Sequence, residues 1–179
     1  MSHPGRSEVW LSENAFISMV AAAVEAFPDE TLGVLIGFRD LGWRKFLTQY
    51  AIVYQTAERA RDQVSADPNR MRRMDKFIER VTTLEVIGDF HSHPKVPVRR
   101  KSSCWLSEDD KKSMSPGDLG FVIAINRDHK ERDWKHLKMG SLLGCVFPYS
   151  LKITGWHMRE KSKPRIAKIH CPFALGLGR

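Results

Sequence analysis

Two histidines separated by one residue, His91 and His93, carry the strongest chemical signal in this sequence. Side chains alternate along a β-strand, so residues at i and i+2 project from the same side and can bind one metal ion together. A nearby aspartate would supply a third ligand and leave one coordination position for water. Three protein ligands with an open position are typical of a catalytic zinc, whereas structural zinc sites usually have four protein ligands. The pattern therefore predicts a zinc site of the catalytic type.

The third ligand is predicted at the start of a short helix. Ser107 is a suitable N-cap, and Asp110 lies one turn further along the chain. Both residues would stabilise the N-terminus of the helix, and a capped helix is also a rigid support for a ligand. We expect Asp110 to be the ligand, with Asp109 as the competing candidate. The Ser107 hydroxyl could also donate a hydrogen bond to a developing oxyanion.

Glu30 directly precedes an apolar segment over residues 31–37. A carboxylate at this position is either exposed between a helix and a strand or acts as a general base beside the metal. Zinc lowers the pKa of a bound water from 15.7 to about 7. A carboxylate within hydrogen-bond reach can take the proton during attack and pass it to the leaving amine. The second interpretation makes Glu30 the expected acid/base residue.

The segments around these residues predict an α/β fold with a mixed sheet. Apolar residues at helical spacing predict helices over 12–27 and 67–81. The inner face of the second is expected to contain Met71, Met74, Phe77, Ile78 and Val81. Apolar or alternating segments predict strands over 31–37, 43–54, 84–91, 120–126, 137–146 and 150–157. The first two strands would form a hairpin, and the third would carry the histidines at its end. No element is predicted over 55–65 or 160–179.

Composition narrows the class of protein. A chain of 179 residues is long enough to bury a core, and we expect one domain over 1–179. No apolar segment approaches the roughly 18 residues of a membrane span, and the polar start lacks the apolar region of a signal peptide. We therefore expect a cytoplasmic protein with no membrane partner. The net charge of +8 could attract nucleic acid, but the basic residues are scattered and match no nucleic-acid-binding module, so we expect no such partner.

These motifs together resemble the JAMM motif of the MPN-domain (Mov34-type) zinc metalloproteases. The resemblance rests on Glu30-x-x-Gly33 before an apolar strand, on the segment 88–94, and on Ser107-x-x-Asp110, in this order. It implies a cytidine-deaminase-like fold, in which helices flank a mixed central sheet. It implies that Glu30 is the acid/base residue and that Ser107 supports the tetrahedral intermediate. It also implies Zn²⁺ as the cofactor, bound by His91, His93 and Asp110.

Members of this family hydrolyse isopeptide bonds between a lysine side chain and the C-terminal glycine of ubiquitin or a ubiquitin-like modifier. The resemblance therefore implies a deubiquitinase-like isopeptidase whose substrates are conjugates of such a modifier. The compact chain resembles the stand-alone prokaryotic members. Two alternatives stay open: a non-catalytic MPN-type scaffold, and a JAMM-like hydrolase of small peptide or amino-acid conjugates. The sequence does not predict the oligomeric state.

The connection between the histidines and the short helix departs from the family pattern. Residues 94–106 form a longer segment than family members commonly have. It would place Arg99, Arg100 and Lys101 near the mouth of the site. The loop could then act as a lid, contact an acidic modifier, or be a tolerated surface insertion. The same loop holds Cys104, which could be a fourth ligand or a redox-sensitive group. The odd number and wide spacing of the three cysteines otherwise predict reduced thiols.

Overall fold

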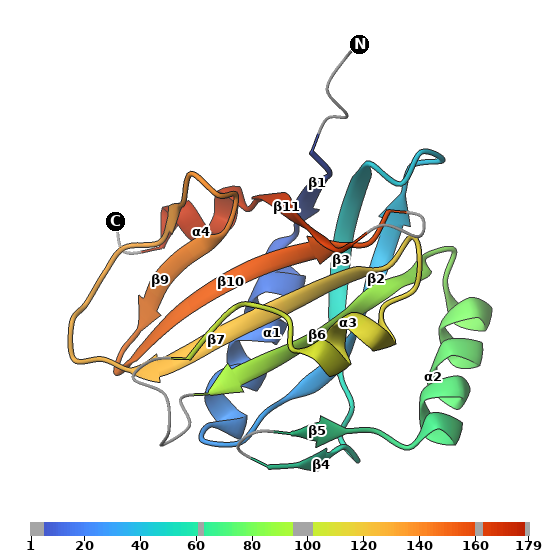
Figure 1. Ribbon diagram of the computed structural model, residues 1–179, viewed down its shortest axis with the longest axis horizontal. Coiled ribbons are helices and arrows are strands. Elements are labelled where there is room, and N and C mark those ends of the chain that lie inside the picture. Colours follow the sequence, from blue (N-terminus) through green and yellow to red (C-terminus); the bar gives the residue numbers. More distant parts are fainter. Residues whose placement is uncertain (1–5, 61–62, 95–101, 160–162, 178–179) are drawn as a thin grey trace.

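The computed structural model describes residues 6–60, 63–94, 102–159 and 163–177 (Figure 1). Its main sheet is nine-stranded, in the order β11-β1-β3-β2-β6-β7-β10-β9-β8. The strands are β1 (Glu8–Leu11), β2 (Leu32–Arg39), β3 (Lys45–Val53), β6 (Glu85–Pro94), β7 (Leu119–Arg127), β8 (Lys135–His136), β9 (Leu142–Val146), β10 (Tyr149–His157) and β11 (Arg165–His170). Because β11 pairs with both β1 and β10, the sheet closes into a barrel. The β1–β3, β1–β11 and β6–β7 pairs are parallel and the others antiparallel, which confirms the predicted α/β fold with a mixed sheet.

The described residues form four helices: α1 (Glu13–Ala26), α2 (Pro68–Val81), α3 (Glu108–Ser113) and α4 (Pro172–Gly176). The first begins as predicted, because the Ser12 hydroxyl accepts a hydrogen bond from the Ala15 backbone N–H. The second begins at Asp67, whose carboxylate accepts hydrogen bonds from the backbone of the first turn. None of the helices in the described ranges is long and apolar enough to cross a membrane.

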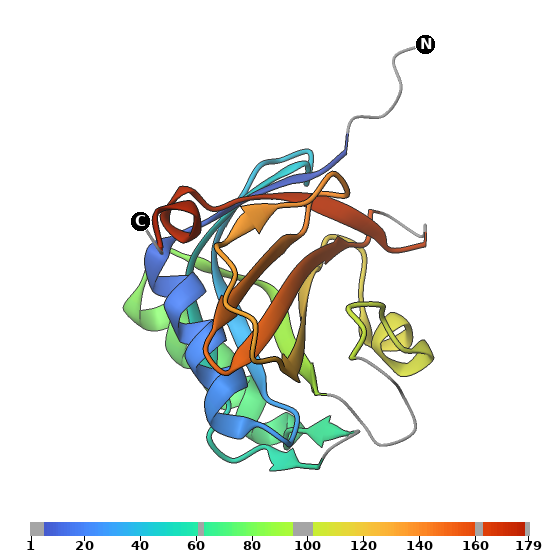
Figure 2. The same cartoon turned by 90° about the vertical axis from the view of Figure 1, so that its left-hand side faces the viewer.

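Helices cover both faces of the sheet, and this arrangement positions the candidate site (Figures 1 and 2). Helix α1 packs into the main core, together with Leu35 of β2 and Ile123 of β7. The opposite face carries two smaller clusters. One joins Val34 to Ile78 of α2, and the other joins Val122 of β7 to Leu106, just before α3. Strand β2 is therefore buried on both faces, which agrees with its nearly continuous apolar sequence.

A bulge in β6 decides which side chains face this second surface. The pairing of β2 with β6 shifts register between Leu35 and Ile36, opposite Gly88. Gly88 has a φ of 151°, a conformation that L side chains rarely adopt. One extra residue in a strand moves every following side chain to the other face. After the bulge, Phe90 points into the main core and His91 faces the opposite surface.

Several predicted elements need correction. Strand β6 continues to Pro94, beyond the predicted end at residue 91. In α2, Phe77 is 56% and Val81 is 60% exposed, because this helix buries only a narrow stripe centred on Ile78. The sequence also gave no prediction for β1, for the small hairpin of β4 (Glu58–Arg59) and β5 (Val64–Ser65), or for β11 and α4. Whether residues 1–179 form one domain stays a prediction.

Candidate metal centre

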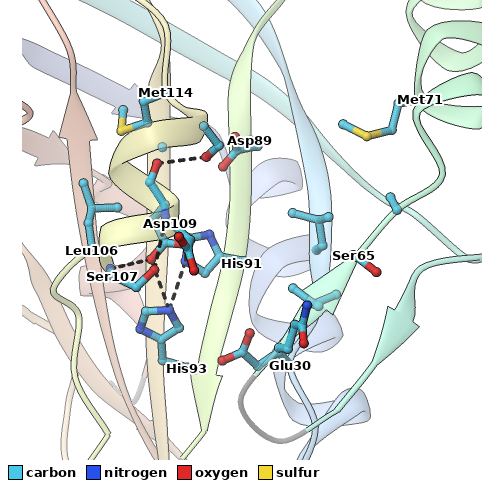
Figure 3. A pocket seen from close by; sticks show the side chains of 17 residues that line it. Glu30, Ser65, Met71, Asp89, His91, His93, Leu106, Ser107, Asp109 and Met114 are labelled. Atoms are coloured by element: carbon cyan, nitrogen blue, oxygen red, sulfur yellow. Dashed lines mark hydrogen bonds and ion pairs between the residues drawn. The ribbon is translucent and has the colours of Figure 1, made fainter.

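Strand β6 presents His91 and His93 on the same face, as their spacing predicts (Figure 3). Their Nε2 atoms lie 3.1 Å apart. The Nδ1 atom of His93 lies 2.9 Å from the carbonyl oxygen of Ser103, which can only accept a hydrogen bond. His93 therefore carries its proton on Nδ1 and directs the lone pair of Nε2 toward His91. Two such nitrogens so close together need a proton or a cation between them.

Helix α3 brings Asp110 to the two histidines through a capping box. The Ser107 hydroxyl accepts a hydrogen bond of 3.0 Å from the Asp110 backbone N–H. In return, Oδ2 of Asp110 accepts one of 2.6 Å from the Ser107 backbone N–H. These reciprocal bonds fix the carboxylate, whose Oδ1 lies 3.5 Å from His91 Nε2 and whose Oδ2 lies 3.6 Å from His93 Nε2.

The three side chains fit a zinc ion. Each offers one ligand atom, and these atoms all lie within 4.8 Å of one another. Zinc bonds of about 2.0–2.1 Å to nitrogen and oxygen separate tetrahedral ligand atoms by about 3.3 Å. His91 Nε2 lies 3.1 Å from His93 Nε2 and 3.5 Å from Asp110 Oδ1, one separation on each side of that value. The other carboxylate oxygen, Oδ2, is the one that lies 3.6 Å from His93 Nε2. Two imidazoles and one carboxylate form a donor set that zinc accepts, with a position left for another ligand.

The charges at the site are coupled. Burial opposes protonation of His91, but the hydrogen bond and the charge of Asp110 outweigh it and raise the pKa of His91 above its ordinary value. Burial likewise opposes ionisation of Asp110, yet the interactions with His91 and Ser107 lower the pKa of Asp110 well below its usual range. Asp110 is therefore an anion at neutral pH, the form in which a carboxylate binds metal.

Glu30 lies across the site from the histidines and is only 9% exposed, unlike the surface carboxylate of the alternative interpretation. Its carboxylate points toward them in Figure 3. The position of Glu30 is set by its neighbours. The Thr31 backbone N–H donates to the Ser92 hydroxyl at 2.9 Å, and the Ser92 N–H donates to the Thr31 carbonyl at 3.0 Å. The residue between the two histidines thus ties the Glu30 segment to β6.

A cavity of about 590 Å³ surrounds these residues. Glu30, Asp89, His91, His93, Ser107 and Asp110 all contribute to its lining. One wall continues through Gln63 to Ala66 and Met71, and the other through Leu106 and Met114 (Figure 3). The structure therefore gathers every site residue predicted from the sequence around one cavity.

Neither competing candidate, Asp109 or Cys104, is brought to the two histidines. The Asp109 carboxylate is 92% exposed and pairs with Lys112 at 2.9 Å, whereas Asp110 faces the histidines. Cys104 is buried, with its Sγ 3.1 Å from the carbonyl oxygen of Lys152 on β10. It is therefore not brought to the metal centre as a fourth ligand. Burial also raises the pKa of the Cys104 thiol, which disfavours the reactive thiolate. All three cysteines are free thiols.

The long connection returns to the sheet through specific contacts. Asn126 of β7 accepts a hydrogen bond from the Ser102 backbone N–H at 2.9 Å and donates one to the Ser102 hydroxyl at 2.7 Å. The indole N–H of Trp156 donates to the Cys104 carbonyl at 2.9 Å. These bonds anchor the approach to α3 despite the extra length of the loop. The basic residues Arg99, Arg100 and Lys101 lie outside the described residues.

Sequence reasoning missed two functional candidates, Ser92 and Asp89. Ser92 separates the two histidines, and the alternation of side chains along the strand places it on the opposite face. Asp89 lies two residues before His91 and lines the cavity. Burial raises the pKa of the Asp89 carboxyl to about 6, with the charges of Asp118 and Asp110 adding to the effect and that of His91 opposing it. The i, i+2, i+4 pattern of Asp89 with the two histidines could have revealed it.

Comparisons with known proteins bear on the family and the fold. A family model described as prokaryotic homologs of the JAB domain matches residues 12–138. Among solved structures, the solution structure of protein DSY2949 from Desulfitobacterium hafniense has a TM-score of 0.61 at 19% sequence identity. The match covers 91% of this chain and 92% of that chain. An identity this low supports a shared fold alone. No curated protein matches the sequence.

Proposed function

Because the chain belongs to the prokaryotic homologs of the JAB domain, we propose that it is a zinc-dependent hydrolase of the JAMM type that cleaves isopeptide bonds. The convergence of His91, His93 and Asp110 opposite Glu30 carries this proposal. A family member that serves only as a scaffold has no need of three metal ligands opposite a carboxylate. The proposal extends to the fold, which we infer to be of the cytidine-deaminase-like class.

The chain's own residues have distinct roles in this proposal. His91, His93 and Asp110 would hold Zn²⁺, which supplies Lewis-acid chemistry when bound and lowers the pKa of a coordinated water from 15.7 to about 7. Glu30 accepts the proton of the attacking water on its carboxylate and returns it to the leaving amine. The Ser107 oxygen already accepts the Asp110 N–H, so its own O–H is available to donate to the developing oxyanion.

The proposed substrate is a protein conjugate of ubiquitin or a ubiquitin-like modifier, joined through a lysine side chain. The cavity is lined by residues 63–66 of the β4–β5 hairpin segment on one side and by residues of α3 on the other, which suits an extended peptide. Its volume of about 590 Å³ also suits a small peptide or amino-acid conjugate. Hydrolysis of such conjugates is therefore the second candidate.

A cleavage assay with two probes tests the proposal. One probe is diubiquitin, and the other is a short peptide with Gly-Gly attached to a lysine side chain. We expect the zinc-loaded protein to release the amine product, and Glu30→Gln to retain zinc but not to cleave. Cleavage of the short probe alone would favour the small-conjugate hydrolase. A zinc-loaded wild type that leaves both probes intact would contradict the isopeptidase proposal, and loss of zinc in Glu30→Gln would contradict its role as the base.

A further inference from the structure

A second cavity, of about 360 Å³, lies on the face of the sheet that carries the metal ligands. His93 of β6 is in register with Ala124 of β7, which is in register with Lys152 of β10. Neighbouring strands lie about 4.8 Å apart, so Lys152 is about two strand spacings from His93. The sheet lines this cavity with Ala124, Asn126, Leu143, Ser150 and Lys152. Its volume falls in the range of roughly 300–1,000 Å³ that is typical of small-molecule sites.

The segment before α3 separates this second cavity from the metal centre (Figure 1). Residues 102–105 line the second cavity, whereas Leu106 and Ser107 line the cavity of the metal centre. The described linings of the two cavities have no residue in common. Two hydrogen bonds between Ser102 and Asn126 hold the segment to β7. The second cavity is therefore a site of its own.

The charged side chains that line the second cavity are cationic. They are Lys152 and Arg132, and the described lining contains no carboxylate. The cross-strand neighbours of Lys152 are Ala124 and Leu143, which carry no charge. Within the described ranges, no carboxylate pairs with the Lys152 ammonium group, whereas Nη2 of Arg132 donates to Asp128 at 2.7 Å. A guanidinium group has five N–H donors, so Arg132 keeps others for a ligand.

Two serine hydroxyls of the lining are also available as donors. Ser102 Oγ accepts a hydrogen bond of 2.7 Å from the Asn126 amide, and Ser103 Oγ accepts one of 3.2 Å from the Trp105 backbone N–H. Each hydroxyl keeps its own hydrogen for a further acceptor. A cavity that offers ammonium, guanidinium and hydroxyl donors is complementary to an oxyanion.

We propose that the second cavity binds a small molecule that carries an oxyanion, either a phosphate or a carboxylate. The Lys152 ammonium group makes the central charged contact, and Arg132, Ser102 and Ser103 supply the other donors. A bound oxyanion gives Lys152, through a charge-assisted hydrogen bond, the anionic partner that the described residues do not provide. This site is separate from the cavity of the proposed hydrolysis, so the inference goes beyond that function.

A titration followed by NMR spectroscopy tests this inference. The probes are inorganic phosphate and acetate, added to the zinc-loaded protein while sodium chloride holds the ionic strength constant. We expect saturable shifts of the backbone amide signals of residues 102–105 and 150–152 with at least one probe. Tighter binding of phosphate would indicate a phosphorylated ligand, and tighter binding of acetate would indicate a carboxylate ligand.

Variants assign the binding to this cavity. Lys152→Gln should raise the Kd of the probe about tenfold, the effect expected of one hydrogen bond between charged groups, and Lys152→Arg should largely restore it. Lys45→Gln removes the same charge from an exposed position on β3 and should bind like the wild type. Asp110→Ala, which removes a metal ligand, should also bind like the wild type, because the two linings are separate.

The inference is overturned if neither probe shifts these amide signals in the wild type, a result that does not depend on how the variants fold. It is also overturned if Lys152→Gln binds as tightly as the wild type. Loss of binding in Asp110→Ala would place the anion at the metal and would overturn it as well. Because the test needs no turnover, its outcome is distinguishable from failure of the proposed hydrolase function.

Discussion

His91 Nε2 lies 3.5 Å from Asp110 Oδ1, although the two residues come from different elements on either side of a long connection. Each residue is fixed independently of the other. His91 is placed by the bulge at Gly88, and Asp110 by the capping box with Ser107. Two side chains held in this way lose little conformational freedom on binding a shared ion, which is the arrangement expected of a preorganised metal site.

The metal ligands can be separated from their neighbours by substitution. We expect about one zinc per wild-type chain, none in Asp110→Ala, and the wild-type content in Asp109→Ala, because the Asp109 side chain pairs with Lys112. Metal analysis of the three proteins purified side by side measures this. Zinc retained by Asp110→Ala, or lost from Asp109→Ala, would move the third ligand to another residue.

Removal of the metal should destabilise the fold. An ion that binds only the folded state adds about 4 kcal/mol when its free concentration is 1,000 times its Kd. We therefore expect a chelator to lower the Tm of the wild type by several degrees and to leave the Tm of Asp110→Ala unchanged. An equal fall in both proteins would show that the chelator acts through another site.

Ser92 should affect activity without affecting metal binding. Its hydroxyl accepts the Thr31 N–H and thereby positions Glu30. Ser92→Ala leaves both histidines in place but removes the hydroxyl that accepts the Thr31 N–H. A misplaced base typically lowers the rate about 100-fold. We expect kcat to fall by about this factor, with wild-type zinc content. Ser141→Ala is the matched control, because it removes a buried hydroxyl that bonds to Thr154 away from the site. Equal losses in both variants would indicate a general effect on stability.

The sequence predicted the site better than the framework that holds it. The spacing of His91 and His93, the N-cap at Ser107 and the apolar strand after Glu30 are local patterns, and each follows from the period of its own element. The pairing of β1 with β3 and β11 joins distant parts of the chain and depends on short strands with no pattern of their own. The face of the sheet that Asp89 shares with the two histidines depends on the bulge, which needs the register of two strands. Tertiary pairing of this kind cannot be read from one segment.

Gly88 should be essential for both the fold and the site. A Cβ atom there would collide with the Leu119 carbonyl oxygen, and its φ of 151° strains any other residue. We expect Gly88→Ala to lower the free energy of unfolding by about 3 kcal/mol or more and to lose zinc, because the bulge directs His91. In Gly120→Ala, on the neighbouring strand, the added Cβ meets only ordinary contacts of 3.7–4.0 Å. This variant should change the free energy of unfolding by no more than about 1 kcal/mol. Urea unfolding measures both, and equal stability of the two variants would contradict this account of the bulge.

His157 should make the protein sensitive to mild acid. The side chain is 3% exposed, contacts the Phe46 ring, and has its Nδ1 2.7 Å from the Ser7 hydroxyl. Burial lowers the pKa of His157 to about 4; the charge of Arg159 adds to this effect and that of Asp40 opposes it.

The unfolded chain therefore binds a proton near pH 6.5 that the folded chain binds only near pH 4. Stability from this group is complete above pH 6.5 and falls by about 3 kcal/mol as the pH drops to 4, at 1.36 kcal/mol per pKa unit. We expect His157→Gln to flatten the fall in unfolding free energy over this range, as measured by urea unfolding at a series of pH values. The same replacement at exposed His129 is the matched control. If the unfolding free energy of His157→Gln falls with pH as steeply as that of the wild type, another group controls the loss of stability in acid.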